Sequence, residues 1–410
     1  MKHVGTPLQA GTPDFGAAGG DTHQPGTALR IAFIAPWNYA NGLGVGARSY
    51  ASAFWHTAHR VNFSPIYRPF HVHARQPLTS DVTNFDGPAD IAIVNINPDG
   101  WDPLLTDAQW AVVRSARARV GAFVWELDTI PESWARFIPS LDAVWTPSRF
   151  CADAIARATD RPVHVIPHPI QVAPPPMVRA AETGVPPGKR TILYAFDGTS
   201  FLSRKRPIAL VEAFAASGLG TRGWQLLLKT KNLQHAGAAG AALMAAVDAD
   251  PAMGLITSTL REDQMSALVE AADIYASPHC SEGYGLTIAE AMARGKLVVA
   301  TDFGGSRDFL DASCGFPVAC RDVKLTKDEG PYMKGGGWAE VEIPALTEAL
   351  LRAAALVEAG DMSLGTAARA RIARDFSPEA VARQMNASLA AIAARSPAAA
   401  SAAPSSAGTL

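Results

Sequence analysis

Cysteine is scarce in this sequence, which has four among 410 residues, and no two of them form a C-x-x-C pair. A disulfide framework in a chain of this length needs more cysteines at closer spacings. The scarcity argues against a disulfide-stapled secreted domain. We expect a reducing compartment and buried thiols at Cys151, Cys280, Cys314 and Cys320.

Long hydrophobic runs are also missing. No uninterrupted apolar run reaches the roughly 18 residues that a membrane-spanning helix needs. The N-terminal sequence MKHVGTPLQAGTPDF lacks the apolar core of a signal peptide. We therefore expect a cytoplasmic protein. A peripheral association with the inner face of a membrane, through arginine-bearing helices such as residues 109–119, stays open.

Neither an excess of positive charge nor a metal-binding pattern is present. The 36 Lys and Arg are balanced by 38 Asp and Glu, which argues against a dedicated nucleic-acid binder. The histidines form no H-x-x-x-H pair, and Asp99 and Asp102 lack the D-x-D spacing of a metal-bound sugar-nucleotide site. We expect no metal and no other cofactor.

What the sequence does contain is an alternation of short apolar runs with longer helical patterns between residues 29 and 393. Nearly continuous apolar runs of this kind are typical of parallel strands covered by helices on both faces. Ligands bind at the carboxyl ends of such strands. The pattern predicts an α/β fold with two doubly wound Rossmann-like domains facing a cleft. The expected strands are 29–36, 61–67, 89–96, 119–126, 143–148 and 163–168, then 191–197, 224–231, 254–260, 273–278, 296–302 and 315–319.

Composition also marks the boundaries of the domains. The first 28 residues hold six Gly and three Pro, and thirteen of the last fifteen residues are Ser, Pro, Ala or Gly, as in disordered tails. Seven prolines between 167 and 189 mark a linker. We expect a disordered tail (1–28), an N-terminal Rossmann-like domain (29–170), a linker (171–189), a C-terminal Rossmann-like domain (190–375), a closing helix (376–393) and a second disordered tail (394–410).

The most informative segment begins at His279 and reads HCSEGYGLTIAEAM. Its glycines allow a sharp turn and a close approach to a ligand, and the helix that begins near Gly285 directs free N–H groups toward an anion. Glu290 lies among apolar residues of that helix, where a vicinal sugar diol would satisfy its carboxylate. The alternative is a glycine turn before a core helix, with Glu290 paired to a structural Lys or Arg.

Residues 277–305, SPHCSEGYGLTIAEAMARGKLVVATDFGG, resemble the donor-binding signature of family 4 glycosyltransferases, which are retaining enzymes with the GT-B fold. The similarity extends over most of residues 29–393, and it implies that the domain 29–170 lies on the acceptor side and that the domain 190–375 binds the donor. It implies that Glu290 binds the ribose of a sugar nucleotide and that Glu282 contacts the donor sugar. It also implies that backbone amides around the turn face the diphosphate. The expected donor site here includes Gly283, Tyr284, Gly285, Leu286 and Thr287.

A basic group follows the expected strand 191–197. A leaving nucleoside diphosphate gathers negative charge, so a site without a metal needs Lys or Arg at the bridging oxygen. Arg204 and Lys205 lie where the family places its phosphate-binding lysine, and Lys229 would be a second cation. Many members carry an arginine shortly before that lysine, where this chain has Thr199. Ser200 or Lys229 would therefore also contact the phosphates. The alternative is a solvated loop.

The first half has a glycine-rich stretch after its first expected strand. Gly42, Gly44 and Ala47 fit G-x-G-x-x-A, but the glycines do not directly follow the strand, and no acidic residue ends the next strand. A nicotinamide enzyme is therefore disfavoured. In the resembled family the corresponding glycine loop lets the N-terminal domain close over the diphosphate, which implies this role for Gly44 and Gly46.

Trp125 and Glu126 end the expected strand 119–126. Family members often have a His there, near the reacting sugar, and the W-E variant is similar to a subset of bacterial polysaccharide-type members. In the functional interpretation, Glu126 hydrogen-bonds a donor or acceptor hydroxyl and Trp125 offers a stacking face to a sugar. In the alternative, Glu126 caps the following turn and Trp125 lies in the domain interface.

The leading hypothesis is a hexosyltransferase-type glycosyltransferase that moves a sugar from a nucleotide-diphosphate sugar to a hydroxyl of a glycan or lipid-linked glycan. The resemblance implies retention of configuration, with Glu282, Lys205 and Arg204 as catalytic residues. The alternative is a non-catalytic glycan- or nucleotide-binding protein with the GT-B fold. A hydrolase is disfavoured because a glycine turn and more than one helical turn separate Glu282 from Glu290.

Overall fold

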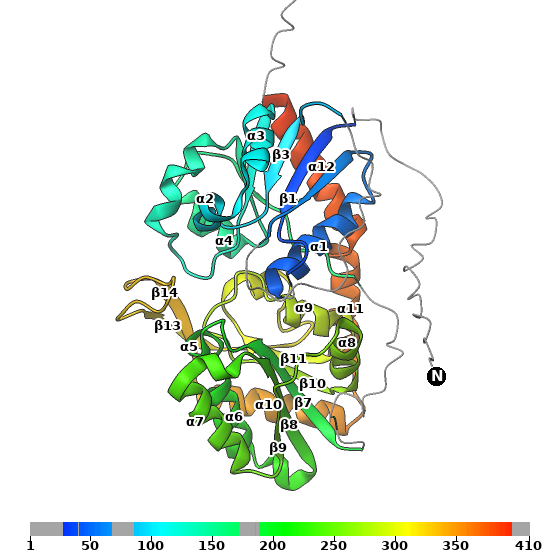
Figure 1. The fold of residues 1–410 in the computed structure, drawn as a ribbon. Coiled ribbons are helices and arrows are strands. Elements are labelled where there is room, and N and C mark those ends of the chain that lie inside the picture. The colour runs from blue at the N-terminus through cyan, green and yellow to red at the C-terminus, as the bar shows by residue number, and fades with distance from the viewer. Residues whose placement is uncertain (1–27, 40, 68–85, 172–184, 186–187, 396–410) are drawn as a thin grey trace, which may run out of the picture.

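The computed structural model describes residues 28–39, 41–67, 86–171, 185 and 188–395. Two lobes follow one another along the chain, each built around a parallel sheet (Figure 1). The expected tails 1–28 and 394–410 and the expected linker 171–189 lie almost entirely outside the described residues.

The first sheet has six parallel strands in the order β2-β1-β3-β4-β5-β6. Every residue of β3 and β5 is buried, as the continuous apolar runs indicate for strands covered on both faces. The strands are β1 (Arg30–Ala35), β2 (Arg60–Pro65), β3 (Ile91–Val94), β4 (Ala118–Ala122), β5 (Ala143–Thr146) and β6 (Val163–Val165).

The second sheet repeats this plan with the order β12-β11-β10-β7-β8-β9, again entirely parallel. Its strands are β7 (Arg190–Asp197), β8 (Trp224–Lys231), β9 (Met253–Ile256), β10 (Ile274–Ser277), β11 (Leu297–Thr301) and β12 (Phe316–Val318). Each of the twelve strands overlaps one of the expected runs, so the predicted α/β fold with two doubly wound domains is confirmed. A separate antiparallel pair, β13 (Cys320–Lys324) and β14 (Gly337–Val341), was not expected from the sequence.

Helices cover the faces of both sheets (Figure 1). Those of the first half are α1 (Gly42–Phe54), α2 (Trp101–Leu104), α3 (Asp107–Ser115) and α4 (Arg149–Ala156). Those that follow are α5 (Leu202–Lys205), α6 (Pro207–Ser217), α7 (Gly237–Asp248), α8 (Glu262–Ala271), α9 (Leu286–Ala293), α10 (Ile343–Glu358), α11 (Ser363–Asp375) and α12 (Pro378–Arg395). Among the helices of the described residues, none is both long and apolar enough to span a membrane.

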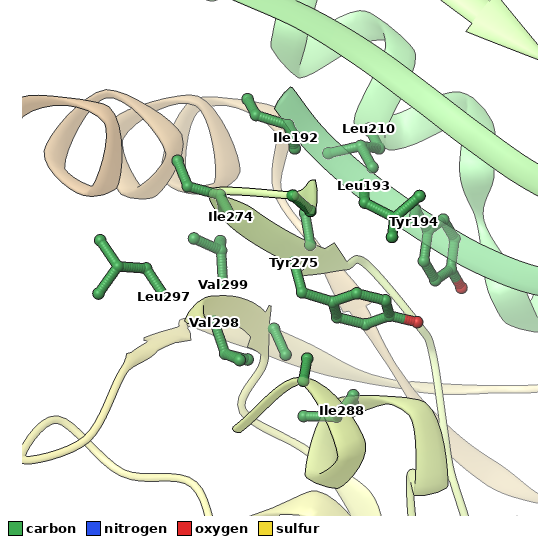
Figure 2. Packing of buried hydrophobic residues seen from close by; sticks show 14 of the residues in the cluster. Ile192, Leu193, Tyr194, Leu210, Ile274, Tyr275, Ile288, Leu297, Val298 and Val299 are labelled. Atoms are coloured by element: carbon green, nitrogen blue, oxygen red, sulfur yellow. The ribbon is translucent and has the colours of Figure 1, made fainter. Parts of the chain in front are cut away.

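The core of the second half is continuous across its sheet. Figure 2 shows Ile192 of β7, Ile274 of β10 and Val299 of β11 in this core, with Ile288 of α9 packed nearby. Burial of such side chains removes apolar surface from water, which contributes roughly 1.5–3 kcal/mol for each large aliphatic group. This core fixes β7 and β10 side by side, and the loops that follow both strands are thereby held at one edge of the sheet.

The last helix, α12, packs on the first half rather than on the second half, which we expected it to close. Val381, Met385 and Leu389 recur at helical spacing and join the core around β1. Trp145 of β5 donates its ring N–H to Ser388 at 2.8 Å. The chain therefore returns to the first sheet after completing the second.

We expect Gly44→Ala to destabilise the protein by about 1–3 kcal/mol, the cost of overpacking a close contact. A Cβ at this position of α1 would overlap the carbonyl oxygen of Tyr39. The matched control is Gly42→Ala in the same helix, because a Cβ there meets nothing within 4 Å. Urea unfolding of the three proteins measures the difference. Equal stability of the two variants would contradict this account of Gly44.

Candidate functional site

The expected donor segment lies where the strand order of the second sheet reverses. From β7 the chain continues to β8 on one side, and the later β10 lies on its other side. Ligands of open α/β sheets bind outside the carboxyl ends of the strands at such a switch point. The loops at this place are residues 198–201 after β7 and residues 278–285 after β10.

A glycine turn joins β10 to α9. Gly285 has a φ of +95°, which residues with a side chain rarely adopt, and it caps the helix. Its carbonyl accepts from Ile288 and Ala289. The amides of Leu286 and Thr287 belong to the first turn, so they have no acceptor within the helix. The turn thus presents two N–H groups of the kind that bind an anion.

Two residues of this turn are used to join the halves of the molecule. The carbonyl of Gly283 accepts from the hydroxyl of Ser148 at 2.6 Å, and a Cβ on Gly283 would lie 2.5 Å from a methyl group of Val124. The hydroxyl of Tyr284 donates to the carbonyl of His168 at 3.0 Å. We expected Gly283 and Tyr284 in the donor site, but these contacts face the first half.

Glu282, Arg204 and Lys205 come together in a group that we call the ion-pair cluster. The ammonium of Lys205 donates to one carboxylate oxygen of Glu282, and the Arg204 guanidinium lies 3.3 Å from the other. Arg204 also donates to the carbonyl of Ser281 at 2.7 Å. Burial would raise the pKa of Glu282, but the charges of Lys205 and Arg204 lower this pKa to about 2. The carboxylate is therefore ionised at neutral pH.

Glu126 approaches the ion-pair cluster from the first half, after β4. Its carboxylate lies 3.9 Å from the Arg204 guanidinium, and the hydroxyl of Tyr332 lies near enough to favour the charged form and lower its pKa. Burial raises the pKa of Glu126, although Arg204 opposes the shift. The structure thus places Glu126 and Glu282 against the same cation.

Trp125 does not offer a stacking face to a sugar. Its ring is buried, 5.2 Å from the ring of Trp134 and 5.6 Å from that of Tyr332. Its N–H donates to the carbonyl of Thr129 at 2.6 Å. Because Tyr332 belongs to the second half, Trp125 lies in the domain interface, which is the alternative that the sequence left open.

The remaining residues considered for the phosphate site, Lys229, Thr199 and Ser200, lie near the carboxyl ends of β8 and β7. Lys229 lies two residues before the end of β8 and donates from its ammonium to the carbonyl of Thr230 at 2.9 Å. Burial, helped by Lys231, lowers the pKa of Lys229 to about 8. Thr199 hydrogen-bonds the carboxylate of Asp197 at 2.7 Å, so it serves the turn after β7. The amide of Ser200 donates to the carbonyl of Asp197 at 3.0 Å.

Glu290 lies on α9 with a half-buried side chain. Burial raises the pKa of Glu290 to about 7, against the charge of Arg294 one turn later. Arg294 forms an ion pair with Glu270 at 3.5 Å and donates to Ser266 at 2.8 Å. The carboxylate of Glu290 is therefore not the salt-bridge partner of this arginine.

The two expected glycines of the first half do not form a loop. Both lie inside α1, whose N-cap Asn41 accepts from the amides of Leu43 and Gly44. Gly44 packs on the backbone of Tyr39, and a Cβ on Gly46 would lie 2.7 Å from the ring of His168. Close packing of the helix explains why glycine is needed at both positions, and their expected contact with a diphosphate stays untested.

Sequence reasoning missed Tyr332, which contacts Arg204 of the cluster, and the pair of Asp128 and Lys324 that joins the two halves. Tyr332 contacts Glu126 and Arg204, while Asp128 accepts from Lys324 at 2.6 Å across the domain boundary. Tyr332 and Lys324 belong to the segment of β13 and β14. The turn-rich stretch GPYMKGGG between two short runs was a signal for this hairpin.

Within the described part of the chain, no group of three or more His, Cys, Asp or Glu side chains could hold a metal ion. All four cysteines lie in this part and are free, three of them buried. The expected absence of a cofactor stays a prediction.

The ion-pair cluster predicts a pH-dependent contribution to stability. The pKa of Glu282 in the folded protein is about 2, below the ordinary value of 4.5. Ionised Glu282 therefore stabilises the fold fully above about pH 4.5 and less as the pH falls toward 2. We expect Glu282→Gln to cost about 3–5 kcal/mol at pH 7, because two buried cations lose their partner. Urea unfolding at pH 7 and pH 3.5 checks that the difference from wild type shrinks in acid.

The matched control is Glu270→Gln. Glu270 also pairs with one arginine and one lysine, Arg294 and Lys296, but its side chain is 44% exposed. Such a pair contributes about 0–1 kcal/mol. A Glu282→Gln cost as small as that of the control would show that the cluster does not stabilise the fold.

Residues 222–328 match the family model described as "Glycosyl transferases group 1". This segment contains β8 to β13 and therefore the glycine turn, Glu282 and Glu290, whereas Arg204 and Lys205 precede it. No curated protein sequence matches the chain significantly.

Solved structures resemble the whole molecule. A glycosyltransferase from Rickettsia africae ESF-5 is 17% identical with a TM-score of 0.63, covering 89% of this chain and 99% of that one. Sucrose-phosphate synthase from Thermosynechococcus elongatus is also 17% identical, with a TM-score of 0.63, 90% of this chain covered and 100% of that one. Anabaena HepE in complex with UDP-glucose is 14% identical with a TM-score of 0.60, and the match covers 88% of this chain and 100% of that one. At these identities the likeness concerns the fold, and the two six-stranded parallel sheets have the GT-B arrangement of glycosyltransferases.

Proposed function

We propose that this protein is a retaining glycosyltransferase of family 4, transferring a hexose from a nucleotide-diphosphate sugar to a hydroxyl of a glycan or lipid-linked glycan. The observation that carries the proposal is the ionised Glu282, held by Lys205 and Arg204 at the switch point of the second sheet. The family-model match over residues 222–328 supports it, as does the fold shared with a structure that holds UDP-glucose.

The leaving group would be held by Lys205 and the start of α9. As the glycosidic bond breaks, the departing diphosphate gains negative charge, which a lysine and free helix amides stabilise more than they stabilise the ground state. Lys205 is paired with Glu282 in this structure. Because its side chain is 15% exposed against 5% for Arg204, Lys205 is the cation better placed to exchange this partner for a phosphate oxygen.

Glu282 would then act on the sugar. Once Lys205 turns to the phosphate, one carboxylate oxygen is released to accept from a donor-sugar hydroxyl, while Arg204 keeps the other oxygen in place. The negative charge also favours the positive charge that develops near the anomeric carbon. Retention follows if the departing diphosphate itself takes the proton of the acceptor hydroxyl, which requires no protein nucleophile.

The nucleoside would be bound by the residues farther from the reacting bond. Glu290 accepts from the ribose hydroxyls as a carboxylate, and Lys229 supplies a second cation to the diphosphate. The pKa values of about 7 and about 8 place both groups close to their titration at neutral pH. Neither Glu290 nor Lys229 has to gain or lose a proton during the transfer step.

The second candidate is a non-catalytic nucleotide- or glycan-binding protein. Two observations favour it: Thr199 hydrogen-bonds Asp197 where many family 4 members carry an arginine, and both cations of the ion-pair cluster already have carboxylate partners. Catalysis therefore depends on whether a donor displaces Glu282 from Lys205.

Replacing Glu282 separates the two candidates. In an enzyme, Glu282→Gln lowers the transfer or donor-hydrolysis rate by about 100-fold or more, the size of a lost electrostatic contact in the transition state. Nucleotide binding does not weaken, because Lys205 no longer has to leave a carboxylate to reach the phosphate. Rates are measured with UDP, GDP and dTDP sugars, and affinities by calorimetry, with Glu270→Gln as the active control. A wild type that binds a sugar nucleotide but neither transfers nor hydrolyses it would favour the binding protein.

Donor affinity should be greatest between about pH 7 and pH 8. Below this range Glu290 binds a proton and no longer accepts as a carboxylate, and above it Lys229 loses its charge. Each loss removes a hydrogen bond to a charged group, about 1.5–3 kcal/mol. Titration of the intact sugar nucleotide at pH 6, 7.5 and 9 checks this, since its doubly esterified diphosphate does not titrate in that range.

The two limbs have separate controls. Glu290→Gln should flatten the acidic limb and Lys229→Arg the alkaline limb, because glutamine does not titrate and arginine stays charged. An unchanged profile in both variants would remove these residues from the proposed donor site.

A further inference from the structure

The hairpin of β13 and β14 belongs to neither six-stranded sheet. Its strands pair antiparallel from Cys320 with Val341 to Lys324 with Gly337, and it projects beside α5 at the level where the two lobes meet (Figure 1). We call residues 320–341 the hairpin. Because α5 carries Arg204 and Lys205, the hairpin lies next to the ion-pair cluster.

The hairpin is attached to the second half around this cluster. The amide of Ala339 donates to the carbonyl of Cys280 at 2.9 Å, and Arg206 pairs with Glu340 at 3.2 Å. The hydroxyl of Ser203 donates to Glu329 at 2.9 Å. These contacts fix the hairpin to the loop after β10 and to the residues that flank Arg204 and Lys205.

The same hairpin also contacts the first half. Asp128, in the loop after β4, accepts from the ammonium of Lys324 at 2.6 Å and from the amide of Gly337 at 2.7 Å. A Cβ on Gly336 would lie 2.5 Å from a methyl group of Leu127. The loop that carries Glu126 is therefore held directly by the hairpin.

Tyr332 lies at the centre of this arrangement. Its side chain is buried, with the ring 5.6 Å from that of Trp125 and 5.4 Å from that of Phe201. The guanidinium carbon of Arg204 lies 5.8 Å from the ring centroid, close enough for a cation–π contact. The hydroxyl lies near enough to the Glu126 carboxylate to lower the pKa of that carboxylate. One side chain thus contacts a carboxylate of the first half and the arginine of the second.

We propose that Tyr332 is a positioning residue of the transferase: it fixes Glu126 against Arg204 and so sets the geometry of Glu282 when the two halves meet. This inference rests on the proposed function. Tyr332 acts through Glu126 and Arg204, and the rest of the hairpin supplies the rigid attachment to both halves. A buried carboxylate that loses a donor must find another or bind a proton.

The electrostatic surroundings of Glu126 come from several elements. Arg204 and Lys205 of α5, Glu282 after β10, Tyr332 of the hairpin and Cys151 of α4 all act on it. Burial raises the pKa of Glu126, and the nearby hydroxyl of Tyr332 opposes that rise. Removing only this hydroxyl should therefore raise the pKa of Glu126 further.

The test compares Tyr332→Phe with Met333→Leu. The first variant removes the hydroxyl and keeps the ring, and the second changes the neighbouring residue, which is 55% exposed. In Tyr332→Phe we expect kcat at pH 7 to fall about tenfold, the value of one hydrogen bond to a charged group, with donor KM nearly unchanged. The acidic limb of the kcat profile should move to higher pH. Met333→Leu should match the wild type throughout.

Hydrogen–deuterium exchange supplies a measurement that needs no activity. Peptides that cover residues 123–128 should exchange faster in Tyr332→Phe and in Lys324→Met than in the wild type or Met333→Leu. If the wild type transfers no sugar, the proposed function fails while exchange still tests the grip of the hairpin. Should Tyr332→Phe unfold, Lys324→Met carries both measurements. A wild-type kcat profile in the folded variants, with or without faster exchange, would overturn the positioning role.

Discussion

The arrangement of the candidate site depends on one buried carboxylate held between two cations. Glu282 follows β10 and would be costly to bury alone, whereas Lys205 and Arg204 follow β7 and would be equally costly without it. Because β7 and β10 are paired neighbours at the switch point, the loops that follow them lie close together, and this brings the three charges into contact. The order of strands in the second sheet is thus the cause of the cluster.

The same loop also determines how the two halves meet. The carbonyl of Gly283, one residue after Glu282, accepts a hydrogen bond from Ser148 of the first half. On its other side the loop packs against Gly304 and Gly305, where a Cβ would overlap the backbone of Glu282 and Gly283. The amide of Gly305 donates to the carbonyl of Glu282 at 2.7 Å. The buried charge, the glycine turn and the domain contact therefore lie within residues 282–285. A shift of the domain contact would move the backbone of Gly283 and, through it, the adjacent Glu282.

The sequence predicted what depends on local pattern and strand ends. Apolar runs separated by helix-length segments predicted the twelve strands of the two parallel sheets, and the loops after β7 and β10 were expected at one site. The direct pairing of Glu282 with Lys205 and Arg204 was not predicted. It did not predict which sheet α12 covers, since helical spacing defines an apolar face but not its partner. Tyr332 was missed for a related reason: its role comes from a long-range contact with Glu126, and the hairpin that carries it has short strands in a turn-rich segment.

The two cations of the cluster differ in what they are able to do. Arg204 donates to the backbone of Ser281 and faces both Glu282 and Glu126, so several of its fixed donors are engaged at once. A planar fork of this kind holds several acceptors in one geometry, whereas an ammonium on a flexible chain exchanges one acceptor for another at lower cost. Arg204 therefore keeps the carboxylates in place and Lys205 is the group that moves. The hairpin reinforces this division, because Tyr332 packs against Arg204 and leaves Lys205 as the more exposed of the two.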